Sequence, residues 1–150
     1  MSQAKSLYDE VILDHIRSAR NFRELADADR RAEGVNPLCG DVFTVYLKLA
    51  GERIREASFQ CECCGISMAS ASVMTEVVRD RTLREAAELA AQFKSLVQRP
   101  AEANTADLEA GCLAVLSVVR ASPSRGNCAA LAWHTLEAAL NGERSTTLGA

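Results

Sequence analysis

The spacing of apolar residues along the chain predicts which segments are helices and which are strands. Near the start, an apolar side chain recurs every three or four positions through residues 3–20, which predicts an amphipathic helix. His15 falls on the apolar face of this helix, and we expect it there as a hydrogen-bonded, half-buried side chain. Pro37 and Gly40 then mark a turn in the segment "VNPLCGD".

Two later segments alternate between apolar and polar residues, as strands with one buried face do. In residues 42–50 every second side chain is apolar, beginning at Phe43. Residues 53–62 alternate again, with Ile54 and Phe59 expected on opposite faces. The short turn between these segments predicts an antiparallel hairpin, and residues 32–36 predict a third short strand.

The rest of the chain has the pattern of helices. The predicted helices cover residues 67–80, 83–98, 110–120 and 128–140. We expect Ser67, Thr82 and Asn127 to be N-caps, and Asn141-Gly142 to end the last helix. The polar tail 143–150 is expected to be frayed. These elements predict a single α+β domain over residues 1–150, with a small antiparallel sheet of two to three strands packed against about five helices.

Composition narrows the function classes. The chain has 150 residues, of which 48% are hydrophobic and 25% charged, as in an ordinary globular domain. A formal net charge of −3 without a basic stripe argues against a nucleic-acid partner. The charged N-terminus does not resemble a signal peptide and no segment resembles a membrane span, so we expect a cytoplasmic protein without a membrane partner. In that compartment, six cysteines favour free, metal-bound or reactive thiols over disulfides.

Three cysteines lie at turns or helix starts. Cys39 lies in the turn before the hairpin, Cys64 precedes the helix expected at 67–80, and Cys128 lies in the first turn of the last helix. A helix N-terminus stabilises a thiolate, and Asp41 adds a carboxylate beside Cys39. This set suits tetrahedral zinc or iron in a sulfur-rich cluster.

The spacing of these cysteines matches no compact zinc finger, however. Each cysteine is therefore also open to interpretation as a small buried hydrophobic residue. Cys112, inside the apolar segment "AGCLAVLSVV", fits that interpretation best.

Four motifs resemble the U-type iron–sulfur biogenesis family, which includes IscU, the N-terminal domain of NifU, and SufU. The motifs are "LYDEVILDHIRSARNF" (7–22), "NPLCGD" (36–41), "SFQCECCGISMASASVMTEVV" (58–78) and "SPSRGNCAALAWHTLEAAL" (122–140). They span nearly the whole chain. The resemblance implies a SufE/NifU-like fold, a small antiparallel sheet covered by helices with the metal site at one end, which agrees with the order of elements predicted above.

Within this family the chain resembles the SufU type. IscU-type members have a histidine directly before the last cysteine, where this chain has Asn127, and a proline-rich segment that "ASPSRGN" does not match. SufU-type members have an aspartate after the first cysteine, a long segment before the third, and an arginine three residues before the last. Asp41 and Arg125 are at the matching positions of this chain.

The resemblance implies a zinc-dependent sulfurtransferase in iron–sulfur cluster assembly. Cys39, Asp41, Cys64 and Cys128 would hold one zinc ion. Cys39 would accept persulfide sulfur from a pyridoxal-phosphate cysteine desulfurase, after a histidine of that partner displaces it from zinc. Arg125 would pair with Asp41 or cover the site in the free protein; the alternative is a solvated surface arginine. Iron–sulfur carrier or scaffold proteins are the further partners implied.

Two other functions remain open from the sequence. The same cysteines could build a transient iron–sulfur cluster and hand it to apo-proteins, or zinc could be purely structural in a binding module.

The chain departs from the family pattern at "FQCECC". Members usually read F-x-G-x-G-C there, so Cys61 and Cys63 replace glycines. Along a strand these two side chains share one face. Both lie close enough in sequence to Cys64 to be oxidised with it, and Cys63 is a possible rival metal ligand.

Overall fold

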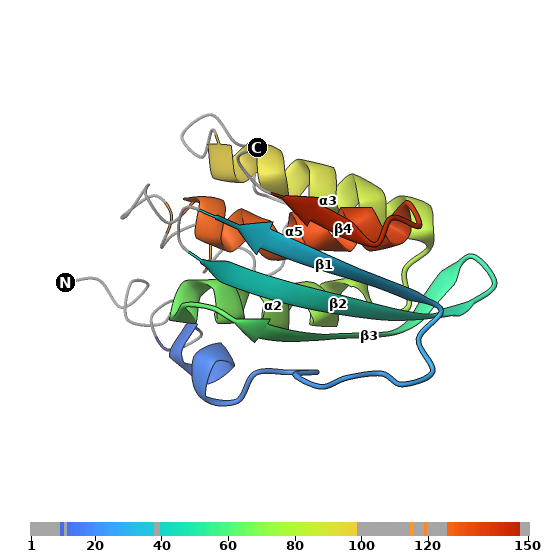
Figure 1. Ribbon diagram of the computed structural model, residues 1–150, viewed down its shortest axis with the longest axis horizontal. Helices are drawn as coiled ribbons and strands as arrows, with labels where there is room; N and C mark the ends of the chain where they lie inside the picture. Colours follow the sequence, from blue (N-terminus) through green and yellow to red (C-terminus); the bar gives the residue numbers. More distant parts are fainter. Residues whose placement is uncertain are drawn as a thin grey trace.

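The computed structural model describes residues 10, 12–37, 40–98, 115, 119 and 126–147. Four strands form one sheet in the order β3-β2-β1-β4, so the α+β class is confirmed with one strand more than expected (Figure 1). The strands are β1 (Arg30–Asn36), β2 (Asp41–Ala50), β3 (Arg53–Glu62) and β4 (Ser145–Thr147), and the main helices are α2 (Gly65–Val78), α3 (Leu83–Gln98) and α5 (Gly126–Leu140).

The predicted hairpin is β2 and β3, joined through Gly51, whose φ of 63° suits glycine. The prediction that Ile54 and Phe59 lie on opposite faces is wrong, because both side chains are fully buried. The reason is a register shift: Lys48 pairs with Glu56 whereas Leu49 pairs with Ile54. One extra residue on β3 reverses the alternation at this point, which is how a β-bulge acts.

The third predicted strand is β1, which pairs antiparallel with β2 along its length. The tail, however, is not frayed throughout as expected. Residues 145–147 form β4, which runs parallel to β1 and pairs Glu33 with Ser145. The amide of Glu33 also donates to the carbonyl oxygen of Arg144 at 2.9 Å. Backbone hydrogen bonds hold this polar segment, so its side-chain pattern gave no sign of it.

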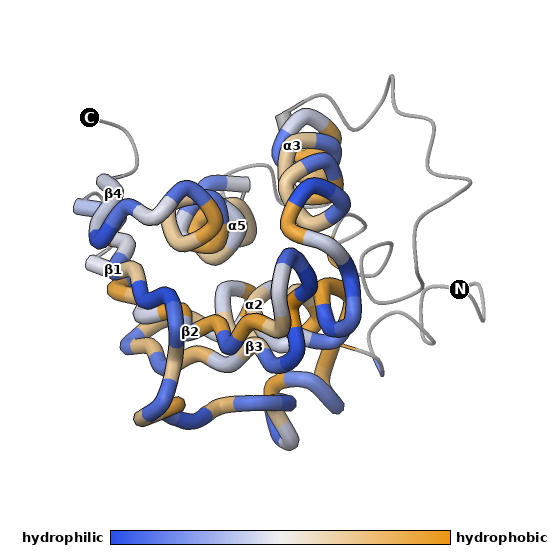
Figure 2. Tube along the Cα trace, turned by 90° about the vertical axis from the view of Figure 1, so that its right-hand side faces the viewer, coloured by the Kyte–Doolittle hydropathy of each residue, from blue (hydrophilic) through white to orange (hydrophobic). Residues whose placement is uncertain are grey.

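The helices cover one face of the sheet in two layers. In Figures 1 and 2, α2 and α5 lie against the sheet, α2 beside β3 and α5 across β1 and β2, and α3 packs on α5. The Phe93 ring of α3 stacks on the buried Trp133 ring of α5 with centroids 4.5 Å apart. Trp133 also donates its indole N–H to Ser70 Oγ at 3.0 Å, which ties α5 to α2.

Helix α5 lies directly against β1 at Gly34. A Cβ atom on Gly34 would lie 1.9 Å from Oγ1 of Thr135 on α5. Any larger residue would therefore push α5 away from the sheet.

Helix ends follow the predicted caps only in part. Thr82 caps the start of α3 as predicted, and the structure adds Glu85, whose carboxylate accepts the Thr82 N–H in a reciprocal capping box. Ser67 and Asn127 are not N-caps, because α2 begins at Gly65 after Cys64, and α5 begins at Gly126. Gly142, with φ of 76°, follows the last helix as expected.

The first helix is shorter than predicted, since among the described residues its helical part ends at residue 17. His15 on this helix is buried and bonded to Ser72, as expected. The helix predicted at 110–120 lies outside the described residues except for Val115 and Val119, which are helical and buried. Within the described part of the chain, every helix is too short or too polar to span a bilayer.

Candidate metal centre

Three side chains from three separate elements meet at one end of the sheet. Asp41 begins β2, Cys64 lies directly before α2, and Cys128 lies in the first turn of α5. One carboxylate oxygen and two sulfur atoms from these residues all lie within 4.8 Å of one another. Asp41 is buried at 7% exposure, whereas the two cysteines are half-buried. The cluster is therefore compact, and its sulfur atoms face the outside more than its carboxylate does.

The hairpin geometry explains why Asp41 and Cys64 come together. Gly40 has a φ of 77° and donates its N–H to the carbonyl oxygen of Asn36 at 2.8 Å, so the chain reverses there and Asp41 enters β2. At this same end of the sheet, Glu62, the last residue of β3, lies opposite Val42 of β2. The two residues after Glu62 consequently leave β3 beside the start of β2.

Two helix N-termini point toward the cluster. Figure 1 shows α2 and α5 starting at the same end of the sheet, where β1 and β3 end. Cys64 is the N-cap residue of α2, and Cys128 lies in the first turn of α5, where backbone N–H groups lack partners within the helix. The helix dipoles place partial positive charge at this end, which favours thiolates and a carboxylate there.

A fourth residue, Ser67, connects the three, and the sequence analysis missed this role. Its fully buried hydroxyl lies 2.8 Å from Asp41 Oδ2, 2.9 Å from the carbonyl oxygen of Cys128 and 3.3 Å from Cys64 Sγ. A hydroxyl has a single proton to donate, so these acceptors share it. The spacing of three residues from Cys64 is the signal that could have found Ser67, since positions i and i+3 share a helix face.

The structure thus brings together three of the four expected ligands. The fourth, Cys39, and the expected gating residue Arg125 both lie outside the described residues, as does Cys112. In sequence, Cys39 stands two positions before Asp41.

The two extra thiols of the "CECC" segment are joined to each other. Cys61 and Cys63 form a disulfide with their Cα atoms 5.6 Å apart, so the expectation of no disulfides is wrong for this pair. Cys61 lies near the end of β3 and Cys63 directly follows the last strand residue, so both side chains are on one side of the still extended chain. In this state Cys63 is not a rival ligand to Cys64, which has a free thiol.

The two histidines of the chain do not belong to the cluster. Burial lowers the pKa of His15, and the nearby Arg20 lowers it further. His15 Nδ1 lies 2.7 Å from Ser72 Oγ. Burial likewise lowers the pKa of His134, with Lys94 as the second cause. Both shifts favour the neutral imidazole.

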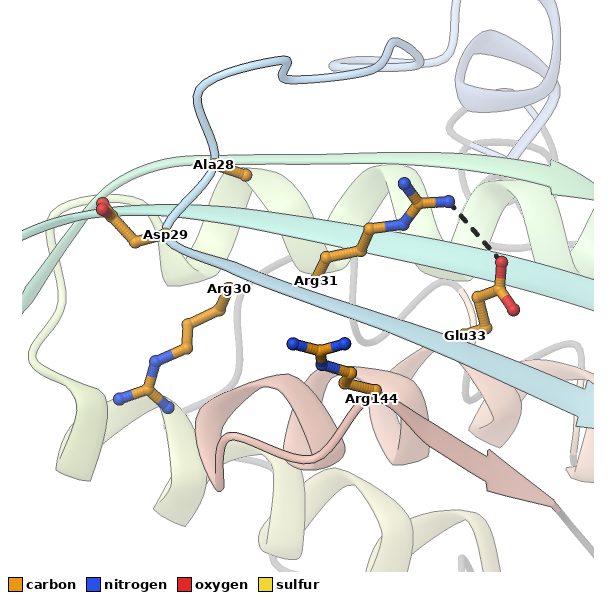
Figure 3. Close-up of a pocket in the computed structure, with 6 residues that line it drawn as sticks. All are labelled: Ala28, Asp29, Arg30, Arg31, Glu33 and Arg144. Carbon is orange, nitrogen blue, oxygen red and sulfur yellow. Dashed lines mark ion pairs between the residues drawn. The ribbon is translucent and has the colours of Figure 1, made fainter.

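A second hollow, of about 480 Å³, lies at the opposite end of β1. Figure 3 shows its lining residues: Ala28, Asp29, Arg30, Arg31, Glu33 and Arg144. Arg30 donates to the carbonyl oxygens of Ala139 and Leu140 at the end of α5, and Arg31 pairs with Glu33 at 3.6 Å. These two guanidinium groups thus already have protein partners, and none of the described residues that line the hollow is a cysteine.

Comparison with known proteins gives a consistent family. The model of the NifU-like N-terminal domain matches residues 7–116. The chain is 36% identical over 132 residues to the zinc-dependent sulfurtransferase SufU of Bacillus subtilis, covering 88% of each protein. It is 34% identical over 140 residues to the iron–sulfur cluster assembly scaffold protein IscU of Streptococcus pyogenes, covering 93% of this chain and 86% of that protein.

A solved structure agrees in fold. A protein from Fervidobacterium islandicum, assigned as an iron–sulfur cluster assembly scaffold for the SUF system, superposes with a TM-score of 0.79 at 30% identity. The match covers 90% of this chain and 97% of that one. Similarity in sequence and in fold thus extends over most of the chain.

Proposed function

Because the chain belongs to the family of NifU-like N-terminal domains, whose relatives here are iron–sulfur cluster assembly proteins, we propose that it is a zinc-dependent sulfurtransferase of that process. It accepts persulfide sulfur from a pyridoxal-phosphate cysteine desulfurase and passes it on toward iron–sulfur scaffold or carrier proteins. The observation that carries the proposal is the convergence of Asp41, Cys64 and Cys128 within 4.8 Å.

The donor set fits zinc. Two thiols and a carboxylate already lie together, and Cys39 supplies the fourth donor from the turn that precedes Asp41. Cysteine sulfur and carboxylate oxygen are both zinc ligands, and four such donors match the tetrahedral coordination of zinc. Bound zinc keeps its cysteine ligands ionised at neutral pH. Cys39, Asp41, Cys64 and Cys128 are therefore the proposed ligands.

Three residues have separate roles in the proposed sulfur transfer. The Cys39 thiolate attacks the terminal sulfur of the desulfurase persulfide, which leaves a thiolate on the partner and a persulfide on Cys39. Ser67 holds the Asp41 carboxylate in place through its hydroxyl. We assign Arg125 to pair with Asp41 or cover the site, because an arginine near a carboxylate neutralises its charge.

Stimulation of a cysteine desulfurase tests this function. Zinc-loaded protein should accelerate the release of alanine from cysteine by the desulfurase, and Cys39→Ala should abolish the acceleration. Cys112→Ala, outside the four motifs, is the matched control and should behave as the parent protein. Equal stimulation by the Cys39→Ala variant would overturn the assignment.

A second function is favoured by the similarity to IscU scaffolds. The same thiols would then build a transient [2Fe–2S] or larger cluster as cargo for apo-proteins. Purified protein separates the two: zinc near one ion per chain with little visible absorbance supports sulfur transfer, and sulfide-to-iron charge-transfer bands support the scaffold. Zinc without either activity would indicate a structural metal in a binding module.

A further inference from the structure

The disulfide between Cys61 and Cys63 stands directly beside the metal-centre cysteine Cys64. A single residue, Glu62, separates the bonded pair, and Cys63 adjoins Cys64 in the chain. All three side chains are half-buried against the core. None of the roles given above uses the two bonded thiols.

This bond contributes little to holding the fold. A cross-link stabilises a protein mainly by closing a loop in the unfolded chain, and the benefit shrinks with the length of the loop. The loop here contains one residue. The backbone is also already fixed by the strand pairing, since Cys61 lies opposite Phe43 and Glu62 opposite Val42. The pair is therefore free to open and close without unfolding the sheet.

The strand register places the pair next to the proposed metal ligands. Glu62 and Val42 are the last partners of the β2–β3 ladder, so Cys63 and Asp41 follow them on the two strands at the same end of the sheet. Cys64 continues from Cys63 into the cluster with Asp41 and Cys128. A persulfide on Cys64 would therefore form on the residue that directly follows Cys63 in the chain.

A solvent-borne reductant can reach the pair, because both cysteines are only half-buried. Cys61 lies opposite the fully buried Phe43, so its side chain is on the core face of the sheet, at the end where the β2–β3 ladder stops. Partly exposed disulfides are more readily reduced than structural ones.

We propose that Cys61 and Cys63 are a redox-active dithiol that reduces sulfane sulfur held on the neighbouring cysteines and releases it as sulfide. This inference rests on the proposed function in one respect: the cluster must carry sulfane sulfur. It adds an activity, because the chain itself then converts bound sulfur to the oxidation state found in iron–sulfur clusters.

The reaction takes two displacement steps. In the first, the Cys63 thiolate attacks the terminal sulfur of a persulfide on Cys64 or Cys39; the S–S bond of that persulfide breaks, and its cysteine leaves as a thiolate. In the second, the Cys61 thiolate attacks Sγ of the Cys63 persulfide, the Cys61–Cys63 bond forms, and hydrosulfide leaves. One proton from the dithiol goes to the site cysteine and the other to the hydrosulfide.

The electrons balance within the chain for one turnover. The dithiol loses two electrons and becomes the disulfide, and the sulfane sulfur gains two and becomes sulfide. A low-molecular-weight thiol or a dithiol reductase then reopens the disulfide by thiol–disulfide exchange. The bonded state in the structure is the product state of this cycle.

A single-turnover experiment tests the proposal. Full-length zinc-loaded protein is reduced, freed of reductant without air, and treated with a limited amount of glutathione persulfide. Released sulfide is measured colorimetrically, and the state of each cysteine is read by alkylation and fragment mass spectrometry. The parent protein should release sulfide and form one Cys61–Cys63 disulfide for each sulfide released.

Three variants locate the two steps. Cys63→Ser should retain the persulfide on Cys64 or Cys39 and release sulfide roughly tenfold more slowly or worse. Cys61→Ser should accumulate the persulfide on Cys63 instead. Glu62→Gln, which keeps both thiols, is the matched control and should release sulfide as the parent does.

The proposal is overturned if the Cys61→Ser/Cys63→Ser double variant releases sulfide as fast as the parent, or if the reduced parent takes up no sulfane sulfur at all. Repeating the experiment with a cysteine desulfurase as donor separates the two hypotheses. Loading by the desulfurase without discharge contradicts only the dithiol role. Discharge after chemical loading, without any loading by the desulfurase, contradicts only the proposed sulfurtransferase.

Discussion

The buried Ser67 hydroxyl lies 2.8 Å from Oδ2 of Asp41, which joins the first turn of α2 to the first residue of β2. The same hydroxyl reaches the carbonyl oxygen of Cys128 at 2.9 Å and so also fixes the start of α5. One side chain thus positions proposed metal ligands that come from three parts of the fold. Groups that orient metal ligands in this way strongly affect metal affinity.

Replacing Ser67 with alanine should therefore weaken zinc binding by about 10- to 100-fold. The alanine side chain leaves the Asp41 carboxylate without its buried donor, so the carboxylate no longer holds one orientation. Competition with a chromophoric chelator measures the change in dissociation constant.

Ser58→Ala is the matched control for that variant. Ser58 is fully buried like Ser67, but among the described residues its hydroxyl is the buried side-chain polar atom without a hydrogen-bond partner. Its removal should leave zinc affinity unchanged and should not reduce stability, because no bond is lost. Equal losses of affinity in both serine variants would show that Ser67 acts only through the fold.

Binding of zinc should stabilise the folded chain. A ligand at 100 times its dissociation constant adds about 2.7 kcal/mol to the free energy of unfolding, provided that the unfolded chain does not bind it. Removing zinc with a chelator should lower the melting temperature of the parent protein. The same treatment should have a much smaller effect on Asp41→Ala and Cys128→Ser, and an equal shift in all three proteins would contradict the ligand assignment.

Gly34→Ala should destabilise the fold by about 1–3 kcal/mol, the usual cost of overpacking. The added methyl group would meet the Thr135 hydroxyl oxygen at 1.9 Å. Thr135→Ala in the same chain should recover part of the loss, because the hydroxyl is then absent. Urea unfolding of both single variants and the double variant measures this, and purely additive changes would show that the two residues do not interact.

The metal-free protein should lose stability as the pH falls below about 6.5. The pKa values of His15 and His134 are both lowered from 6.5 in the folded state, so near pH 6 the unfolded chain binds protons that the folded chain does not. Their contribution is therefore complete above pH 6.5 and declines as the pH decreases. Urea unfolding of metal-free protein between pH 7.5 and 5.5 measures the slope, which His15→Gln should flatten; an unchanged slope would show that His15 is not involved.

Local patterns predicted most of the fold. Alternation placed β2 and β3 at their correct positions, and Thr82 as an N-cap predicted the start of α3. Two features that depend on tertiary contacts, β4 and the β-bulge, could not be predicted from these local patterns. Residues 145–147 pair through their backbone, and the bulge opposite Lys48 and Leu49 depends on pairing across the hairpin, so neither leaves a mark on the pattern of apolar side chains.

The proposed site could be predicted as a set of residue types but not as an arrangement. Cys64 and Cys128 were recognised from their motifs, although spacing alone did not bring them together across 63 intervening residues. Ser67 was taken for a cap, because only the packing of α2 against β2 and α5 gives its hydroxyl three neighbours at the site. The Cys61–Cys63 bond was not predicted, because the expected reducing compartment argued against disulfides, although the two side chains were expected on one face.

X-ray absorption at the zinc edge of the zinc-loaded protein tests the central claim most directly. We expect three sulfur ligands at about 2.3 Å and one oxygen at about 2.0 Å, with the oxygen contribution altered in Asp41→Ala. Four sulfur ligands in the parent protein, or a parent spectrum identical to that of the Asp41→Ala variant, would contradict the proposed site.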